Sequence, residues 1–266
     1  MRFASWRLVR ELLELSDVAL ELTDSRDPLN TRSTKLEKMV SGLGKPLIIV
    51  INKADLVPRH VCEEWKNFFR VKLGYEAVYI SARDRLGTMV LRRTIKRVVK
   101  ESAGEKEKIV VSIFGLPKVG KSTLVNALKG RHSTSTSPYP GYPGYTFKSR
   151  LFYVGGGIYL IDTPGVIPPE TDDVEAVIRS KPVDELSNPE KVAVSLIQKV
   201  LKYNRKAFLE AYGIESEDPN EIIAGVAKLR GWVKRGELDT YEASKAIIRD
   251  YLDGKIVYYY RPTVQQ

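Results

Sequence analysis

Long apolar runs, cysteine and histidine are all scarce in this sequence. The longest apolar runs, such as 46–51 and 109–111, are the length of a strand, whereas a membrane-spanning helix needs about 20 residues. The N-terminal residues carry scattered charges and lack the apolar stretch of a signal peptide. A single cysteine, Cys62, excludes an internal disulfide and fits a reducing compartment. We therefore expect a cytoplasmic protein without a membrane partner.

Positive charge is abundant but uneven along the chain. The 266 residues carry a net charge of +10, of which residues 1–166 hold +12 and residues 167–266 hold −2. A surplus of this size favours polyanionic partners, and nucleic acid is the commonest of these. Solvated lysine and arginine side chains are the alternative explanation, because stable proteins also carry many of them.

Apolar β-rich runs alternate with segments of helical period in the first two thirds of the chain. The alternation predicts strands at 18–24, 46–51, 77–80, 109–114, 151–154 and 158–161, and helices at about 4–15, 31–42, 60–73, 87–101 and 121–129. Near-continuous apolar strands between helices indicate an α/β fold with a mostly parallel sheet. A run of three glycines, 155–157, separates the last two strands, so we expect one antiparallel edge pair there.

The rest of the sequence predicts a linker, a long loop and a second, smaller domain. The linker is 102–108, the Gly/Pro/Ser/Thr/Tyr-rich loop is 131–150, and helical patterns follow at 188–212, 219–234 and 240–252. We expect residues 1–180 to form one domain with a base-reading half, 1–104, and a phosphate half, 109–180. Residues 183–266 would form an all-helical domain that could bind RNA.

The strongest motif is a G-x-x-x-x-G-K-S phosphate loop that follows an apolar strand and opens a helix. Backbone N–H groups and the helix N-terminus would bind phosphates, and Lys121 would reach the β- and γ-phosphates. Ser122 would hold Mg²⁺. The predicted phosphate-binding residues are Gly115, Pro117, Lys118, Val119, Gly120, Lys121, Ser122 and Thr123.

A D-x-x-G motif, from Asp162 to Gly165, ends the strand predicted at 158–161. Asp162 would reach Mg²⁺ through water, and the Gly165 amide would reach the γ-phosphate. From the loop between the two motifs, Thr146 is the candidate that closes over the metal, and Thr134 and Thr136 are its rivals. The predicted metal ligands are thus Ser122, Thr146 and Asp162, and the predicted catalytic residues are Lys121, Thr146 and Gly165.

An N-K-x-D motif follows the second predicted strand. Asp55 can accept hydrogen bonds from the guanine ring N–H and exocyclic amine, whereas adenine presents the opposite donor pattern. Asn52 would donate to the far edge of the base, and Lys53 would lie along it. The backbone of Ser81 and Ala82, at the next strand end, would complete the pocket. The motif therefore predicts selection of GTP over ATP.

The order of these motifs is permuted, because in most GTPases the phosphate loop comes first and the base-reading motifs come last. Chain termini usually lie close together at a domain surface, so a fold can be re-cut in this way without losing its core. The segment after Gly165 then leads directly into the helical domain. We predict that nucleotide state sets the position of that domain.

The motifs in this order resemble the circularly permuted ribosome-biogenesis GTPases of the YlqF/YawG family. The resemblance extends through segments 24–32, 143–146, 235–239 and 248–251, and so covers nearly the whole chain. It implies GTP hydrolysis with Mg²⁺, a role in assembly of the large ribosomal subunit, and binding to ribosomal RNA.

Three departures from related sequences concern hydrolysis. Val166 stands after D-x-x-G, where other GTPases carry a glutamine that orients the attacking water. Some bacterial members are thought to use an N-terminal histidine in place of that glutamine, but this sequence has no histidine before His60. Lys118 replaces the Asn linked to potassium coordination, so its ammonium could stand where K⁺ would sit, or it could point to solvent. His132 is a lone loop histidine, which is usually incidental. We expect slow intrinsic hydrolysis that a ribosomal particle accelerates.

Two basic segments are candidate RNA contacts, and each has a plainer explanation. The first lies on the predicted helix at 87–101, where residues three and four apart share a face; the alternative is a solvated helix face. The second surrounds Trp232, which could stack on a base or lie in the core. The candidates are Arg92, Arg93, Lys96, Arg97, Lys228, Arg230, Lys234 and Arg235.

The combined interpretation is a monomeric, RNA-dependent GTPase switch in large-subunit assembly. One alternative is a nucleotide-gated RNA-binding scaffold with little hydrolysis, which the missing histidine and Lys118 leave open. Another is a GTPase in tRNA modification or translation, which should prefer tRNA or assembled ribosomes.

Overall fold

The computed structural model describes residues 3–129, 135–136, 151–161 and 166–263. The chain divides into two compact units. One comprises residues 2–168 with 262–266, and the other is built from Pro169–Arg261. We refer to them as the α/β unit and the helical unit. Within the described part, no helix combines the length and the apolar character that a membrane span requires.

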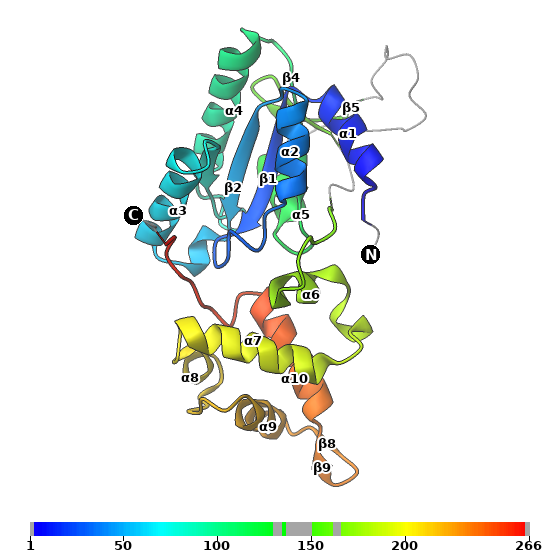
Figure 1. Ribbon diagram of the computed structural model, residues 1–266, viewed down its shortest axis with the longest axis vertical. Helices are drawn as coiled ribbons and strands as arrows, with labels where there is room; N and C mark the ends of the chain where they lie inside the picture. The colour runs from blue at the N-terminus through cyan, green and yellow to red at the C-terminus, as the bar shows by residue number, and fades with distance from the viewer. Residues whose placement is uncertain (1–2, 130–134, 137–150, 162–165, 264–266) are drawn as a thin grey trace. The chain divides into compact units, whose positions relative to one another are not determined.

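A seven-stranded sheet forms the centre of the α/β unit, in the order β3-β2-β1-β4-β7-β6-β5 (Figure 1). Four pairings, β1–β2, β1–β4, β2–β3 and β4–β7, are parallel, which confirms the predicted α/β fold with a mostly parallel sheet. The strands are β1 Val18–Asp24, β2 Leu47–Asn52, β3 Glu76–Tyr79, β4 Ile109–Gly115, β5 Ser135–Thr136, β6 Leu151–Gly155 and β7 Ile158–Ile161.

The antiparallel edge is larger than the sequence predicted. Strands β6 and β7 pair across the three glycines, as expected. Strand β5 adds a second antiparallel pairing, with Ser135 opposite Phe152. A two-residue strand is too short to show a period-2 pattern, so sequence periodicity could not reveal it.

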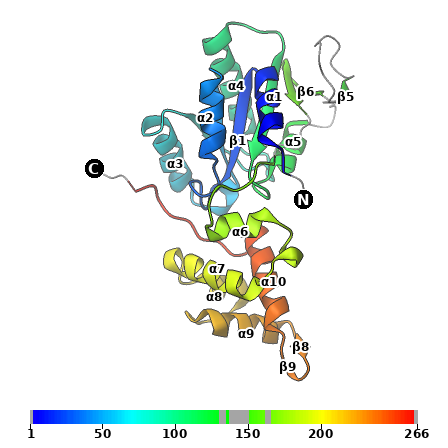
Figure 2. The ribbon, with the colours of Figure 1, turned by 45° about the vertical axis from the view of Figure 1, so that its right-hand side comes forward.

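Helices cover both faces of the sheet (Figures 1 and 2). Their bounds are α1 Trp6–Leu15, α2 Thr34–Gly42, α3 Arg59–Val71, α4 Thr88–Ala103 and α5 Lys121–Lys129. The chain steps outward from β1 to β3 through α2 and α3, and α4 returns it to β4. Because parallel crossovers are right-handed, α4 lies on the face opposite α2 and α3. Every residue of β1 and β2 is therefore buried.

Local sequence explains where these helices begin. Ser5 and Ser33 are N-caps whose side chains accept hydrogen bonds from Leu8 N and Leu36 N. In α3, the apolar spacing of Val61, Cys62, Trp65 and Phe69 turns one face into the core.

The helical unit has its own apolar core, which includes Leu196, Ile197, Ile247 and Ile248. Its α6 packs against α7 and was not predicted, because seven residues give too little periodicity. Its elements are α6 Val174–Ser180, η2 Val183–Glu185, α7 Pro189–Tyr203, α8 Ala207–Tyr212, α9 Pro219–Leu229, β8 Val233–Lys234, β9 Glu237–Leu238 and α10 Thr240–Leu252. The division into base-reading, phosphate and RNA-binding parts stays a prediction.

Two expectations for the helical unit were wrong. The helix predicted at 188–212 is broken into α7 and α8 at Asn204, whose extended backbone ends α7 and whose side-chain amide donates to Val257 O at 3.0 Å. The unit is also not entirely helical. Arg235 and Gly236, at φ 54° and 87°, form a two-residue turn with positive φ that joins β8 to β9.

Candidate guanine nucleotide site

The loop between β4 and α5 has the backbone of a phosphate-binding loop. Lys118 and Gly120 both have positive φ, 64° and 103°, which turns successive N–H groups inward. A side chain at Gly120 would collide with the Asn52 amide, so only glycine fits there. Pro117 and Val119 are buried, and Lys118 is half-buried. The loop thus packs directly against the predicted base-reading turn.

Lys121 lies against the backbone of this loop. Its Nζ donates to Gly115 O at 2.9 Å and to Leu116 O at 2.7 Å. Neutral carbonyl oxygens hold the ammonium without cancelling its charge. Ser122 and Thr123 are exposed in the first turn of α5, where the helix N-terminus favours anions. The described half of this site therefore fits a polyphosphate.

The Mg²⁺ site is only partly within the described residues. Ser122 is there, as an exposed residue at the start of α5. The other predicted ligands and catalytic residues lie outside the described residues: Thr146, Asp162 and Gly165, and also Thr134 and His132. Of Thr136, the other rival of Thr146, only the backbone is described, in β5. Across the described ranges, no group of three or more His, Cys, Asp or Glu residues could hold a metal ion by itself. Ser122 therefore fits a metal that phosphate oxygens also bind.

Asn52 joins three loops of the site. Its Nδ2 donates to Val119 O in the phosphate loop at 2.8 Å, and its Oδ1 accepts from Ala82 N at 3.0 Å. Its exposed fraction is 2%, and Ser81 and Ala82 are also buried. The side chain thus links the end of β2 to the loop after β3 and to the phosphate loop. The contact of Asn52 with the base stays a prediction.

Asp55 lies in a short 3-10 helix, η1 Ala54–Leu56, directly after β2. Its Oδ2 is 2.9 Å from the Arg83 guanidinium, and its side chain is 11% exposed. Arg83 also pairs with Asp84, and this hydrogen bond and then the Asp55 charge raise the pKa of Arg83. The sequence did not reveal this ion pair, because 28 positions separate its partners and no local pattern links them.

Lys53 has a left-handed backbone, with φ 62° and ψ 33°. Its Nζ lies 3.0 Å from Asp24 Oδ2, at the end of the neighbouring strand β1. The guanine-reading motif is therefore in contact with segment 24–32, to which sequence reasoning assigned no role of its own.

Val166 is connected through its backbone. It bridges in parallel to Gly115, and the next residue, Ile167, donates from its N to Gly115 O at 3.2 Å. Ala4 N donates to Val166 O at 2.9 Å. The segment that follows D-x-x-G is thus attached both to the phosphate loop and to the residues before α1.

The basic strip on α4 is largely used within the fold. Arg92 donates to Leu128 O at 2.6 Å, and burial lowers the pKa of its guanidinium. Arg97 pairs with Glu76 and Glu101 at 2.8 and 3.2 Å. In the described part of the chain, the exposed side chains of Arg93 and Lys96 have no ion pair. Two of the four predicted RNA contacts on α4 therefore have structural partners.

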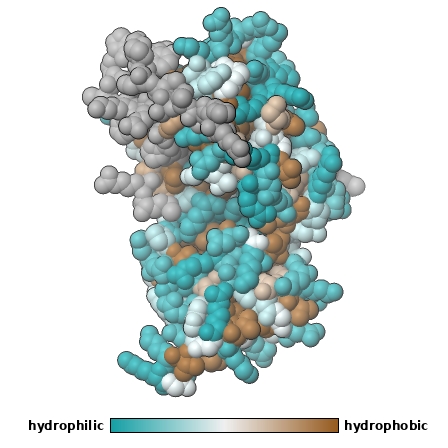
Figure 3. Space-filling model, turned by 180° about the vertical axis from the view of Figure 1, so that it is seen from behind, coloured by the Kyte–Doolittle hydropathy of each residue, from teal (hydrophilic) through white to brown (hydrophobic). Residues whose placement is uncertain are grey.

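The second basic segment divides in a similar way. Arg230 pairs with Asp250 at 2.6 Å and lies over the Trp232 ring, which packs against the core. The remaining candidates, Lys228, Lys234 and Arg235, are exposed, and no described residue forms an ion pair with them. Figure 3 shows apolar and hydrophilic surface intermixed at the end of the helical unit that carries the β8–β9 hairpin.

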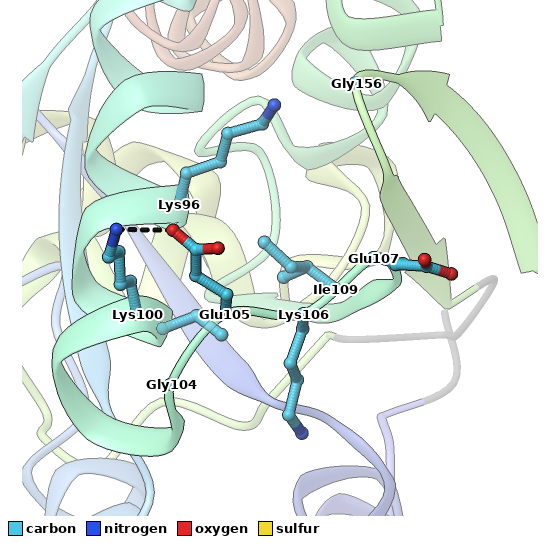
Figure 4. Close-up of a pocket in the computed structure, with 9 residues that line it drawn as sticks. Lys96, Lys100, Gly104, Glu105, Lys106, Glu107, Ile109 and Gly156 are labelled. Atoms are coloured by element: carbon cyan, nitrogen blue, oxygen red, sulfur yellow. Dashed lines mark hydrogen bonds and ion pairs between the residues drawn. The ribbon is translucent and has the colours of Figure 1, made fainter.

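A cavity of about 370 Å³ opens at the other end of the sheet, away from the phosphate loop (Figure 4). Its lining includes Ile109, the first residue of β4, whereas the phosphate loop follows the last one. Lys100 and Glu105 pair within it, and Lys106 pairs with Asp17. Because its charges are largely matched and the predicted nucleotide residues are remote, it is separate from the nucleotide site.

Comparison with known sequences shows close relatives over nearly the whole chain. A family model described as 50S ribosome-binding GTPase matches residues 110–226. Ribosome biogenesis GTPase A of Bacillus cereus is 30% identical over 264 residues, which cover 94% of this chain and 87% of that protein. An uncharacterized GTP-binding protein of Methanocaldococcus jannaschii is 34% identical over 255 residues, covering 95% and 66%.

Other relatives are longer than this chain. Nucleolar GTP-binding protein 2 of Schizosaccharomyces pombe is 30% identical over 265 residues, which cover 97% of this chain but 48% of that protein. The chain thus spans about half the length of several relatives that it matches, and 66% of the length of the M. jannaschii protein.

The fold comparison agrees with the sequence comparison. The structure of YlqF from T. maritima with bound GNP has a TM-score of 0.64 and 24% identity, and the match covers 96% of this chain and 97% of that one. This likeness establishes the permuted strand order as a shared fold. By sequence, the chain belongs to the family of ribosome biogenesis GTPase A, and it shares the circularly permuted GTPase fold of YlqF.

Proposed function

We propose that this chain binds GTP, hydrolyses it to GDP and phosphate, and acts as an RNA-dependent switch in assembly of the large ribosomal subunit. The observation that carries the proposal is the Asn52 side chain, which bonds to Val119 O and Ala82 N and so ties the base-reading turn to the phosphate loop. A nucleotide with a guanine base and a phosphate chain would contact both parts.

The proposed roles follow from chemistry at each position. Lys121 would exchange two carbonyl acceptors for phosphate oxygens, to which a cation bonds more strongly. Ser122, with Thr146 and Asp162, would hold Mg²⁺, which neutralises charge that develops on the phosphate oxygens. The Gly165 amide would bond the γ-phosphate. Asp55 would accept from guanine, and Arg83 would then release part of its contact with that carboxylate.

Slow intrinsic hydrolysis is part of the proposal. Val166 offers no polar side chain to orient water, and its backbone is bound to Gly115 and Ala4. Lys118, half-buried with a left-handed backbone, would supply the positive charge that K⁺ provides in relatives with Asn. We therefore expect turnover that is independent of K⁺ and that rises when a ribosomal particle supplies a further group.

The proposed partner is the large ribosomal subunit. Support comes from the names of the relatives and from exposed cations without ion-pair partners in the described ranges, Lys228, Lys234 and Arg235. Phosphate contacts by such cations give salt-dependent binding.

The test is GTP turnover and co-sedimentation with large subunits, small subunits or tRNA, in sodium and then in potassium. We expect nucleotide-dependent binding to large subunits and stimulated turnover in both salts. Binding without stimulation would favour the scaffold alternative, and a preference for tRNA would favour a role in tRNA modification or translation. Potassium-stimulated turnover would contradict the proposed role of Lys118.

We also propose that nucleotide state moves the helical unit. Ile167 N bonds Gly115 O, which also accepts from Lys121, and the helical unit begins two residues later at Pro169. A change at Lys121 would thus reach the connecting segment. Small-angle scattering profiles of the GDP and non-hydrolysable GTP forms should differ, and identical profiles would count against this coupling.

A further inference from the structure

The end of β1 and the loop after it form a buried, charged cluster next to the predicted guanine-reading turn. Asp24, Ser25, Arg26 and Asp27 have no solvent-exposed surface. The Arg26 guanidinium donates two hydrogen bonds to the Asp24 carboxylate, from Nε to Oδ1 at 3.0 Å and from a terminal nitrogen to Oδ2 at 2.9 Å. Burying such a pair is costly unless its geometry is good and its remaining hydrogen-bonding capacity is used. The question is what that capacity serves.

The Asp24 carboxylate also forms an ion pair with Lys53. Asp24 lies opposite Asn52 in the parallel register of β1 and β2, so its side chain stands beside the residue that follows Asn52. Asp24 Oδ2, which already accepts from Arg26, is also 3.0 Å from Lys53 Nζ. One carboxylate therefore binds two cations, and only one of them, Lys53, belongs to the guanine-reading motif.

Ser25 holds the backbone of the same turn. Its N donates to Asn52 O at 2.8 Å, and its Oγ donates to Lys53 O at 2.7 Å. Thr31 closes the loop, since its Oγ1 accepts from Asp24 N and donates to Asp27 O. A left-handed backbone is unfavourable at a lysine, and it persists only where the surroundings enforce it. Here the contacts of Asp24 and Ser25 enforce it.

We propose that Asp24 is a positioning residue for guanine nucleotides: together with Ser25 it fixes Lys53 and the left-handed turn between Asn52 and Asp55. The inference rests on the proposed nucleotide binding. It assigns a role to Asp24 at the end of β1 and to Ser25 after it, both of which contact the residue that follows Asn52. Its effect belongs to nucleotide affinity and not to the chemical step, so KM should change and kcat should not.

The decisive experiment is a double-mutant cycle on GDP affinity with the full chain. Asp24→Asn should weaken GDP binding about tenfold, because a charge-assisted bond to Lys53 is lost. In a Lys53→Met background the same change should weaken binding less than twofold, because Asp24 acts through Lys53. Equal effects in both backgrounds would overturn the proposal. Absence of GDP binding in the unmodified chain would instead overturn the proposed function.

A second pair of variants guards against misfolding, because Asp24→Asn leaves Arg26 with a weaker partner. Ser25→Ala removes one hydroxyl bond to a backbone carbonyl. Ser16→Ala removes such a bond at the opposite end of β1, where Ser16 Oγ donates to Leu13 O, and also a bond accepted from Ser112 Oγ. Both serines are buried. Ser25→Ala should weaken GDP binding about fivefold at unchanged kcat, and Ser16→Ala less than twofold. Equal affinities would contradict the inference.

Discussion

Each unit of this protein contains one fully buried arginine–carboxylate pair among its described residues, and the two pairs have different surroundings. Arg26–Asp24 lies in the α/β unit and Arg179–Glu175 in the helical unit, and no side chain of either pair is exposed. Besides its arginine, Asp24 also forms an ion pair with Lys53. Besides its arginine, Glu175 also accepts hydrogen bonds from the hydroxyls of two core tyrosines, Tyr251 and Tyr258. The same chemistry would therefore serve the proposed guanine site in one unit, whereas it serves packing in the other.

The largest expected effect comes from breaking the pair in the helical unit. Arg179→Met leaves Glu175 buried without its cation, and should lower the free energy of unfolding of that unit by about 3–5 kcal/mol. Hydrogen exchange followed peptide by peptide would locate the loss in residues 169–261, and GDP affinity should stay within twofold. A parallel loss of GDP affinity would remove the distinction between the two pairs.

Removing both charges of a pair sharpens the comparison. In Glu175→Gln/Arg179→Met, the Gln oxygen still accepts from the tyrosines, so the free energy of unfolding should return to within about 2 kcal/mol of the original. The analogous Asp24→Asn/Arg26→Met should also fold, but its GDP affinity should stay about tenfold weaker because Lys53 lacks a charged acceptor. Denaturant titration and GDP titration measure the two results. Recovery of GDP affinity would mean that Asp24 matters only for stability.

A smaller effect separates the exposed cations of the helical unit from the paired ones of α4. Lys234→Gln/Arg235→Gln should weaken RNA binding about tenfold and lower the slope of log affinity against log salt by about two. Arg97→Gln/Lys100→Gln removes the same charge, but Arg97 and Lys100 already pair with Glu76, Glu101 and Glu105, so the slope should change by less than one. Equal slopes would show that ion pairing does not decide which cations bind.

The smallest expected effect is at Cys62, the single cysteine, in the core of the α/β unit. Burial, with smaller contributions from Glu63 and Asp55, raises the pKa of its thiol from 9.0 to about 12. Alkylation at pH 8 should therefore be slow and unchanged in Arg179→Met, which disturbs only the helical unit. Because the unfolded state ionises first, stability of the α/β unit should fall as pH rises above 9. Fast labelling of Arg179→Met would show that the units unfold together.

Sequence patterns predicted the elements that repeat over several residues. The strands at 18–24 and 158–161 agree residue for residue with β1 and β7, because buried strands next to turn residues give a strong local signal. The phosphate loop and the base-reading turn also follow the predicted strand ends. Elements shorter than about two helical turns, such as α6, β5 and the β8–β9 hairpin, gave no periodicity to detect.

Side-chain partners were beyond reach for a different reason. Arg97 and Arg83 each pair with a carboxylate from another element, Glu76 and Asp55, and the proximity of these partners depends on the folded sheet and not on local spacing. For the same reason, the sequence alone overestimated how many of the basic residues on α4 lack a partner within the fold. The contact between Asp24 and Lys53 likewise exists only because β1 and β2 are neighbours.

The central position of β4 sets an order of events during synthesis. Its partner β1 is made before it and its other partner β7 after it, with about 40 residues between β4 and β7. At roughly 5–20 residues per second, β4 can pair with β1 for about 2–9 s before β7 exists. A growing chain of this permuted fold would therefore complete its predicted guanine-reading turn while the predicted phosphate half still has an open strand edge. Translation would then build the specificity of the site before its chemistry.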